Sequence, residues 1–456
     1  MAALIFDHAL LPNGWAADVR IEITDGVITQ VTPAARRDGP EHVPGIAIPG
    51  MPNLHCHAFQ KGMAGLAEKR GPAHDSFWTW REVMYRFLRV LSPDDVETIG
   101  SYAYMEMLEA GFTAVGEFHY LHHDPEGRPY NDIAELMARI ASAANETGIG
   151  LTLLPSFYAQ GGFGGAAPTP GQRRFITDPD MFLRLVGRAH EIAATLPDAR
   201  VGIAPHSLRA VTPDALQVVL DTVKHGPIHI HAAEQTKEVN DCIAALGARP
   251  VEWLIANAGV DARWCLVHAT HADAGELAGI AASGAVAGLC PITESSLGDG
   301  IFPAAQFLAH RGRIGIGSDS NIQLDAAAEL RTLEYSQRLA QRGRNVLAAG
   351  TAASTGRTLF ESALAGGWRA LHADAPAQPR GLTAGASLDL ITLHSHHPAL
   401  LERRDDEILD SWIFAGGREL IDCVWRAGER VVQGGRHRAR EALIARYGRA
   451  LHELRA

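Results

Sequence analysis

The central part of the chain alternates short apolar runs with longer stretches of helical spacing. Buried parallel strands give such runs, because helices cover both faces of their sheet. Eight of them within about 330 residues predict an α/β fold, a (β/α)8 TIM barrel. A doubly wound sheet is the alternative, but polar residues follow many different strands, and barrel sites are built at the C-terminal strand ends. The eight runs are Ile46–Leu54, Phe112–Phe118, Ile149–Phe157, Val201–Pro205, Ile228–Ala233, Cys265–Ala269, Val286–Cys290 and Ile314–Gly317.

Both ends of the chain look different from this middle, because short strands there are separated by turn signals such as Asp25-Gly26 and Gly434-Gly435. We therefore expect a small β-sandwich domain assembled from residues 1–48 and 383–437, a barrel over residues 49–382, and a C-terminal helix over residues 438–456. The predicted strands are Ala3–Phe6, Asp18–Ile23, Val27–Val31, Leu388–Leu393, Ser411–Phe414, Ile421–Trp425 and Arg430–Gln433.

The composition excludes several classes of partner. The formal net charge is −11 and no run rich in Lys or Arg occurs, which argues against nucleic acid and anionic membrane surfaces. No uncharged apolar run is long enough to span a membrane, and the first residues do not resemble a signal peptide. Five scattered cysteines without a CxxC motif favour a reducing compartment. We expect a cytoplasmic enzyme with a small-molecule substrate.

Histidines at the ends of two predicted strands form the first part of a possible metal site. His55 and His57 are two residues apart, so in a strand both imidazoles point to the same face. His231 ends another apolar run, whereas His229 lies one layer deeper and is expected to be structural. Solvated loop histidines would show the same local pattern. The argument for a metal rests on several strand ends together.

The remaining polar strand ends complete this set. Glu234 follows the His231 strand, His268 ends the next one, and Asp319 follows Ile314–Gly317. Alone, His268 would be a hydrogen-bonded core histidine and Asp319 a helix cap. Together, four strand ends supply four histidines and two carboxylates in barrel order, which predicts a metal site. Donor sets of this kind suit Zn²⁺, and Fe²⁺ also accepts them.

The motifs His55-x-His57, His231-x-x-Glu234, His268 and Ser318-Asp319 resemble the amidohydrolase superfamily, in the order of its mononuclear deaminase branch. Binuclear members use a barrel lysine to bridge two ions, and no lysine here ends a predicted strand, so we expect one Zn²⁺ per chain. The resemblance implies that His55, His57, His231 and Asp319 hold the ion. Glu234 would protonate the imine nitrogen, His268 would stabilise the attacking oxygen, and Asp319 would also accept a proton.

Loop residues beyond the strand ends predict the substrate class. Arg81 and Arg209 suggest a substrate with two carboxylates, since the guanidinium fork matches carboxylate geometry, although surface salt bridges are the simpler reading. Gln60 lies on the same segment as Arg81, His206 lies on that of Arg209, and Tyr120 follows the second predicted strand; all three are predicted to contact the substrate.

These loops resemble the formimidoylglutamate deiminase family, a bacterial family of histidine degradation. Further matching stretches are Gly116–Tyr120, Cys290–Gly300 and Glu329–Tyr335. The resemblance implies hydrolysis of N-formimino-L-glutamate to N-formyl-L-glutamate and ammonia, and a homodimer.

Two alternatives stay open. A purine or adenosine-derivative deaminase carries the same metal motifs but needs an aromatic slot, which Trp78 and Trp80 could supply. A catalytically silent scaffold protein of the same fold is the second alternative, although such a protein should have lost metal ligands.

Overall fold

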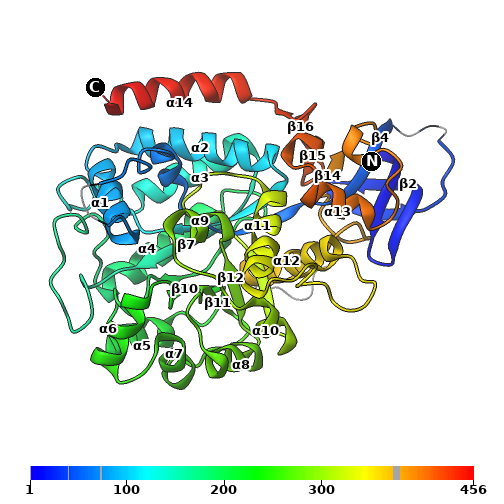
Figure 1. Ribbon diagram of the computed structural model, residues 1–456. Coiled ribbons are helices and arrows are strands. Elements are labelled where there is room, and N and C mark those ends of the chain that lie inside the picture. Colours follow the sequence, from blue (N-terminus) through cyan, green and yellow to red (C-terminus); the bar gives the residue numbers. More distant parts are fainter. Residues whose placement is uncertain (1, 38, 40, 72–73, 373–379, 456) are drawn as a thin grey trace.

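The computed structural model describes residues 2–37, 39, 41–71, 74–372 and 380–455. Its centre is the predicted barrel of parallel strands (Figure 1). The strands pair in two arcs, β5-β6-β7-β8 with β9 on β7, and β10-β11-β12-β13. Their bounds are β5 (Met51–Cys56), β6 (Phe112–His119), β7 (Gly150–Phe157), β8 (Arg200–Val201), β9 (Ala204–Pro205), β10 (Ile228–Ala232), β11 (Trp264–His268), β12 (Val286–Leu289) and β13 (Arg313–Ile316).

Two seams join these arcs into a closed barrel. At one seam, parallel bridge pairing links Ile203 to Ile228. At the other, Cys56 pairs with Asp319, and Ser318 donates its N–H to the carbonyl of His55 over 3.0 Å. Closure removes the open edges of the sheet.

Helices surround the barrel, and several begin at residues that the sequence marks as caps. Ser92 and Asp95 form a capping box at the start of α2, and Asp178 caps α4. The helices are η1 (Ala58–Met63), α1 (Phe77–Leu88), α2 (Pro93–Glu109), α3 (Glu135–Thr147), α4 (Pro179–Ala193), α5 (Pro213–Thr222), α6 (Thr236–Leu246), α7 (Pro250–Asn257), α8 (Ala274–Ser283), α9 (Pro291–Leu297), α10 (Ala304–Ala309), α11 (Ala326–Gln341) and α12 (Thr355–Leu371).

Strands from both termini form the small β domain, in one eight-stranded sheet of order β17-β16-β15-β14-β4-β1-β2-β3. It packs around its own core, in which Phe6 and Trp425 are in edge-to-face contact. The bounds are β1 (Ala2–Leu11), β2 (Gly14–Thr24), β3 (Val27–Thr32), β4 (Glu41–Pro49), β14 (Leu390–Leu393), β15 (Ile421–Arg426), β16 (Glu429–Gln433) and β17 (Arg436–His437).

Three sequence predictions are wrong in detail. Val201–Pro205 is two short strands, β8 and β9, rather than one. Ile46–Leu54 is two strands rather than one, because the chain passes from the small sheet (β4) into the barrel (β5) at Gly50, where a Cβ would lie 2.2 Å from Thr113. Ser411–Phe414 belongs to helix α13 (Glu407–Phe414) instead of a strand. Its buried residues Ile408, Leu409, Trp412 and Ile413 have helical spacing, which the shorter window hid.

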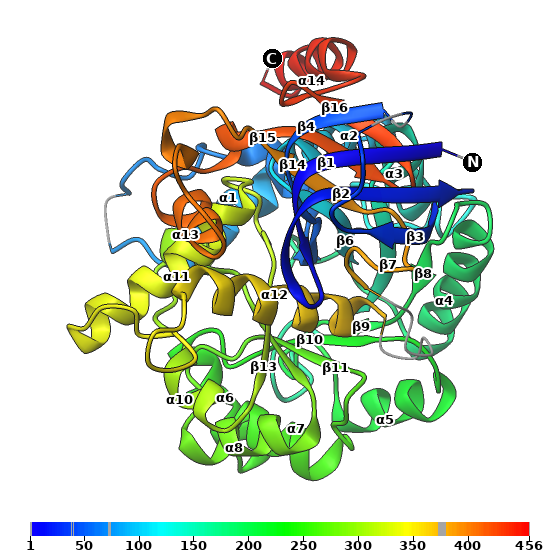
Figure 2. The same cartoon turned by 90° about the vertical axis from the view of Figure 1, so that its right-hand side faces the viewer.

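The C-terminal helix α14 (Arg440–Arg455) lies outside the barrel along α2, where Tyr447 stacks on Tyr102 with ring centres 4.0 Å apart (Figure 1). Figure 2 views the molecule from the side of the small sheet, with the barrel behind it. The domain boundaries remain predictions, and residues 373–379 of the predicted barrel segment lie outside the described residues. The short remaining elements are η2 (Pro398–Leu400) and η3 (Arg418–Leu420).

Two further expectations concern membranes and disulfides. Among the described residues, no helix is long and apolar enough to cross a membrane. All five cysteines are free thiols with buried side chains.

Candidate active site

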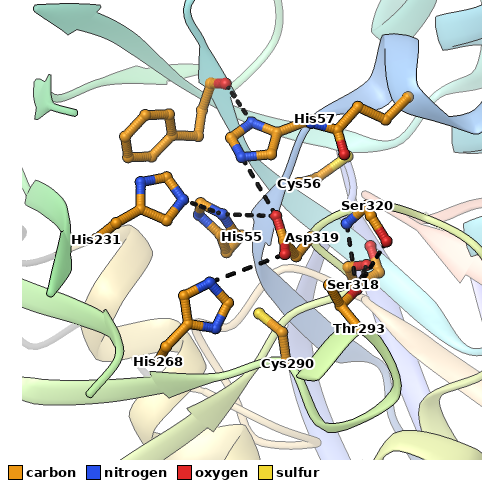
Figure 3. Close-up of polar contacts among 12 residues, drawn as sticks. His55, Cys56, His57, His231, His268, Cys290, Thr293, Ser318, Asp319 and Ser320 are labelled. Carbon is orange, nitrogen blue, oxygen red and sulfur yellow. Dashed lines mark hydrogen bonds and ion pairs between the residues drawn. The ribbon is translucent and has the colours of Figure 1, made fainter. Parts of the chain in front are cut away.

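The four predicted metal donors meet at the C-terminal strand ends. His55 is on β5, His57 directly follows it, His231 is on β10 and Asp319 follows β13. All four side chains are buried, and their ligand atoms lie within 4.8 Å of one another. Figure 3 shows the three imidazoles around the Asp319 carboxylate.

Three of the distances between these donors are close to those around a single tetrahedral ion. Oδ1 of Asp319 lies 3.3 Å from Nε2 of His55 and 3.2 Å from Nε2 of His57. Nε2 of His231 lies 3.2 Å from Nε2 of His55. Donors bound to one tetrahedral zinc ion at about 2.0–2.1 Å stand about 3.3 Å apart.

The protonation of the donors also fits a cation. Nδ1 of His57 donates to the Phe118 carbonyl over 2.9 Å, and Nδ1 of His231 donates to the His206 carbonyl over 3.0 Å, which leaves both Nε2 atoms as acceptors. Burial lowers the pKa of His55 to about 3 and also lowers the pKa of His57 and His231, so the rings are neutral. Burial alone would raise the pKa of Asp319, but its histidine contacts outweigh this and lower it.

The number of ions depends on whether a barrel strand carries a lysine that could bridge two of them. None of the described barrel strands contains a lysine. Lys61 is in η1, and its ammonium group pairs with Glu106 at 2.7 Å, outside the donor cluster. The donor set is therefore that of a single-ion site.

The backbone bends sharply where the strands deliver these side chains. Ala233, His268, Ala269 and Asp319 all have positive φ, between 41° and 67°. The left-handed region is unfavourable for residues with a Cβ, and such strain clusters at functional sites. These bends lie at the ends of β10 and β11 and in the loop after β13.

Glu234 and His268 lie beside the donors. Nε2 of His268 is 3.7 Å from Oε1 of Glu234 and 3.8 Å from Oδ2 of Asp319. Burial raises the pKa of Glu234. Burial would lower the pKa of His268, but nearby carboxylates outweigh it and raise that pKa well above its usual value. The pair can exchange a proton with a substrate near neutral pH.

Sequence reasoning missed Glu294, which lies on α9 after the β12 strand. Its Oε1 accepts a hydrogen bond from Nδ1 of His268 at 3.1 Å and another from the backbone N–H of Cys290 at 2.8 Å. Glu294 falls within the stretch Cys290–Gly300, which the sequence marked only as a family resemblance. The available signal was an acid four residues beyond the end of the predicted run Val286–Cys290.

The predicted substrate residues line one cavity with the metal donors. Gln60, Arg81, Tyr120, His206 and Arg209 all face it, together with Glu234 and His268. Helix α1, which carries Arg81, lies on the side of the molecule opposite to the small sheet (Figure 1). Aromatic walls complete the cavity. Trp80 is one that the sequence suggested for the alternative substrate class, whereas Phe77, Tyr158 and Phe175 were not predicted.

Polar atoms in this cavity lack protein partners. Nε of Arg81 and both Nε and Nη1 of Arg209 are buried without a hydrogen-bond partner, as is Oε1 of Gln60. Nε2 of Gln60 donates to the Tyr120 hydroxyl over 2.8 Å. Orphaned buried donors are rare, because each costs about 1–3 kcal/mol. Such donors are expected where a ligand completes the hydrogen bonding.

Comparison with known proteins agrees with this geometry. The model of the amidohydrolase family matches residues 46–355, and the formimidoylglutamate deiminase HutF N-terminal domain matches residues 2–43. An adenosine deaminase from Xanthomonas campestris with bound zinc has a TM-score of 0.81 at 22% identity, with 100% of this chain and 98% of that chain covered, a likeness of fold. Fold and match place the chain in the amidohydrolase family.

Two full-length relatives narrow the assignment to one family within the amidohydrolases. A formimidoylglutamate deiminase of Pseudomonas aeruginosa is 52% identical over 459 residues, covering 100% of both chains. The crystal structure of an amidohydrolase from Brucella melitensis superposes with a TM-score of 0.95 at 50% identity, again over 100% of each chain. Within the amidohydrolases, the chain belongs to the formimidoylglutamate deiminase family.

Proposed function

We propose that this protein hydrolyses N-formimino-L-glutamate to N-formyl-L-glutamate and ammonia, with one zinc ion per chain. The observation that carries this proposal is the pair of pocket arginines, whose buried N–H groups have no partner in the described chain. A substrate with two carboxylates supplies acceptors for them. The family to which the chain belongs supports the same substrate.

The ion would be held by His55, His57, His231 and Asp319, since their donor atoms lie within 4.8 Å of one another and the imidazoles are neutral. When bound, zinc would act as a Lewis acid and lower the pKa of a water molecule to about 7. We expect about one zinc per purified chain by elemental analysis. Two tightly held ions, or full activity in protein stripped of metal, would contradict the single-ion site.

The neighbouring residues would move the protons. Water adds its oxygen to the C=N carbon, Asp319 accepts the first proton of that water, and Glu234 delivers its own proton to the imine nitrogen. Glu234 then takes the remaining proton from the new hydroxyl group and passes it to the departing amine, and the proton on Asp319 returns to Glu234. His268 stabilises the oxygen that adds to the carbon, helped by its raised pKa. The carbon–nitrogen bond breaks, so formimino group and water become a formyl group and ammonia.

The role of Glu234 is open to a direct test. Glu234→Gln keeps the shape of the side chain but cannot deliver a proton, so we expect ammonia release to fall by about 10² or more. Zinc content should stay the same, because Glu234 is not among the four donors. Near-normal turnover in this variant would remove Glu234 from the mechanism.

The alternative substrate class is a purine or adenosine derivative. The cavity does have aromatic walls, including Trp80 and Tyr158, but Trp78 is not part of its lining. The unpartnered guanidinium groups favour an anion over a neutral base. Ammonia release from N-formimino-L-glutamate, measured beside a panel of nucleosides, separates the two, and a silent scaffold would release none from either.

We further propose that the protein is a homodimer in the cytoplasm. The family resemblance suggests the dimer, and five free buried cysteines suit a reducing compartment. Light scattering should give twice the chain mass of 48.9 kDa. A particle with the mass of one chain would refute the dimer.

A further inference from the structure

Three cationic side chains surround the indole of Trp78 on helix α1. The guanidinium carbon of Arg81 lies 4.6 Å from the ring centre, and that of Arg209 lies 5.7 Å from it. The Lys237 ammonium group is also 5.7 Å away. Arg81 comes from α1 and Arg209 from the loop after β9, so the indole joins two walls of the cavity.

The two arginines need something to hold them in place. In the described chain neither guanidinium forms an ion pair with a carboxylate, and both have buried N–H groups without partners. Two like charges in one partly closed cavity repel each other. The negative face of an indole attracts guanidinium groups by cation–π interaction, more strongly when they are desolvated. Trp78 therefore offsets part of this repulsion.

The helical spacing on α1 fixes one of these contacts. Arg81 is three residues after Trp78 and four before Tyr85, so all three share one face of the helix. The guanidinium carbon of Arg81 is in reach of both rings, since it also lies 5.4 Å from the centre of the Tyr85 ring. The position of Arg81 is therefore built into α1, and Trp78 presents the same indole to Arg209.

We infer that Trp78 is a positioning residue: it sets the distance between the guanidinium groups of Arg81 and Arg209, and through that distance it selects dicarboxylates of one chain length. Trp78 itself does not line the cavity. The inference rests on the proposed binding of a dicarboxylate by the two arginines. Trp78 is the residue that would set the spacing of these two arginines.

Equilibrium binding tests this without turnover. Calorimetry on the zinc-loaded enzyme would compare succinate, glutarate and adipate, of which glutarate matches the carbon chain between the carboxylates of glutamate. Trp78→Leu should weaken glutarate binding about tenfold, since the cation–π contacts to both arginines are lost. The preference for glutarate over its shorter and longer neighbours should shrink. Trp78→Phe, which keeps an aromatic face, should restore most of both properties.

Kinetics and a double-mutant cycle separate positioning from a general loss of structure. Trp78→Leu should raise KM for N-formimino-L-glutamate about tenfold and leave kcat within about threefold. In an Arg209→Met background the same change should cost much less, because the partner is already absent. Trp78→Met carries the same predictions and is the variant to use if Trp78→Leu does not fold.

Lys237→Gln is the matched control. Lys237 also lies over Trp78, but its side chain is 60% exposed, pairs with Asp241 and does not line the cavity. This change should leave glutarate binding within about twofold.

Two results would overturn the inference. One is unchanged chain-length preference in Trp78→Leu, and the other is fully additive losses in the cycle. If the wild-type enzyme binds glutarate in a Trp78-dependent way but releases no ammonia from N-formimino-L-glutamate, the proposed function fails and the inference about Trp78 stands.

Discussion

Buried carboxylates stand behind the two residues that would move protons. Glu294 accepts from Nδ1 of His268, and Glu238 accepts the backbone N–H groups of Ala233 and Glu234 at 3.2 and 3.1 Å. A carboxylate partner fixes the tautomer and the orientation of an imidazole ring. At the scale of single residues, the site thus depends on acids that do not touch the substrate.

Glu294→Gln tests this dependence. The amide is nearly isosteric but uncharged, so His268 loses the carboxylate that orients it and raises its pKa. We expect kcat to fall about 10- to 100-fold, with little change in zinc content. The pH at which kcat declines on the alkaline side should move to lower values, because an imidazolium with fewer carboxylate partners loses its proton earlier.

Glu334→Gln serves as the control for burying an amide. Glu334 is fully buried and accepts the N–H groups of Val346 and Leu347, and it is not among the residues that line the cavity. The Glu334→Gln variant should have a lower free energy of unfolding but an unchanged pH dependence of kcat. A Glu294 variant with the wild-type profile and kcat would reduce Glu294 to a packing role.

The sequence predicts the residues of this site better than it predicts the backbone bends and hydrogen bonds that hold them in place. The four donors, Glu234 and His268 follow strands whose apolar runs are easy to recognise, and the structure brings all six together. The positive φ of His268 and the hydrogen bond from Glu294 have no local signal, since each depends on a neighbouring strand. The sequence suggests Trp78 only as a wall of an aromatic slot for a purine base, because spacing along the chain does not reveal which cations lie over its ring.

At the level of helices and strands, the geometry of the metal site depends most on the barrel seam between β5 and β13. Asn53 accepts the N–H of Ser318 over 3.0 Å, and Asn321 donates to the carbonyl of His57 over 2.9 Å. These bonds join the strand that carries two donors to the loop that carries Asp319. The seam therefore sets the distance between donors far apart in sequence.

Gly317→Ala would open this seam. A Cβ at Gly317 would lie 2.8 Å from the carbonyl oxygen of His55 and 2.9 Å from its Cβ, and β5 cannot yield without moving His55. We expect a destabilisation of about 1–3 kcal/mol and a zinc affinity reduced at least tenfold. Thermal unfolding and zinc titration with a competing chelator measure the two effects.

Gly187→Ala, on helix α4, provides the comparison. Nothing lies within 4 Å of a Cβ there, so the change should be neutral or stabilise by about 0.5–1 kcal/mol. Equal behaviour of the two alanine variants would show that the seam tolerates a methyl group.

Helices and strands were predictable where a pattern runs through the whole element. The eight apolar runs of the barrel show such a pattern from end to end. The short helix η1 and the window Ser411–Phe414 within α13 do not. Ser411–Phe414 reads as a strand in isolation, but Ile408 and Leu409, one turn earlier, make its apolar face helical. The division of Ile46–Leu54 depends on contact between Gly50 and Thr113, which lie 63 positions apart and share no local signal.

For the whole molecule, the ion would act as a cross-link. Its donors come from β5 and the residue after it, from β10, and from the loop after β13, so one ion ties together both arcs of the barrel. An ion that binds the folded chain alone stabilises it by about 2.7 kcal/mol at a free concentration 100 times its Kd. Metal removal should therefore loosen the barrel as well as abolish activity.

We expect the metal-free protein to unfold on the order of 5 °C below the zinc-loaded form, and added Zn²⁺ to restore the difference. Asp319→Ala should remove most of this dependence, because one of four donors is lost. His229→Asn is the contrasting variant: His229 is buried on the same strand as His231, but its Nε2 donates to the Ala370 carbonyl at 3.0 Å and it is not a donor to the ion. Its unfolding temperature should drop with and without zinc by similar amounts, so the zinc-induced shift is kept. If Asp319→Ala and wild type show the same zinc-induced shift in unfolding temperature, the ion binds elsewhere and the cross-link between the two arcs does not exist.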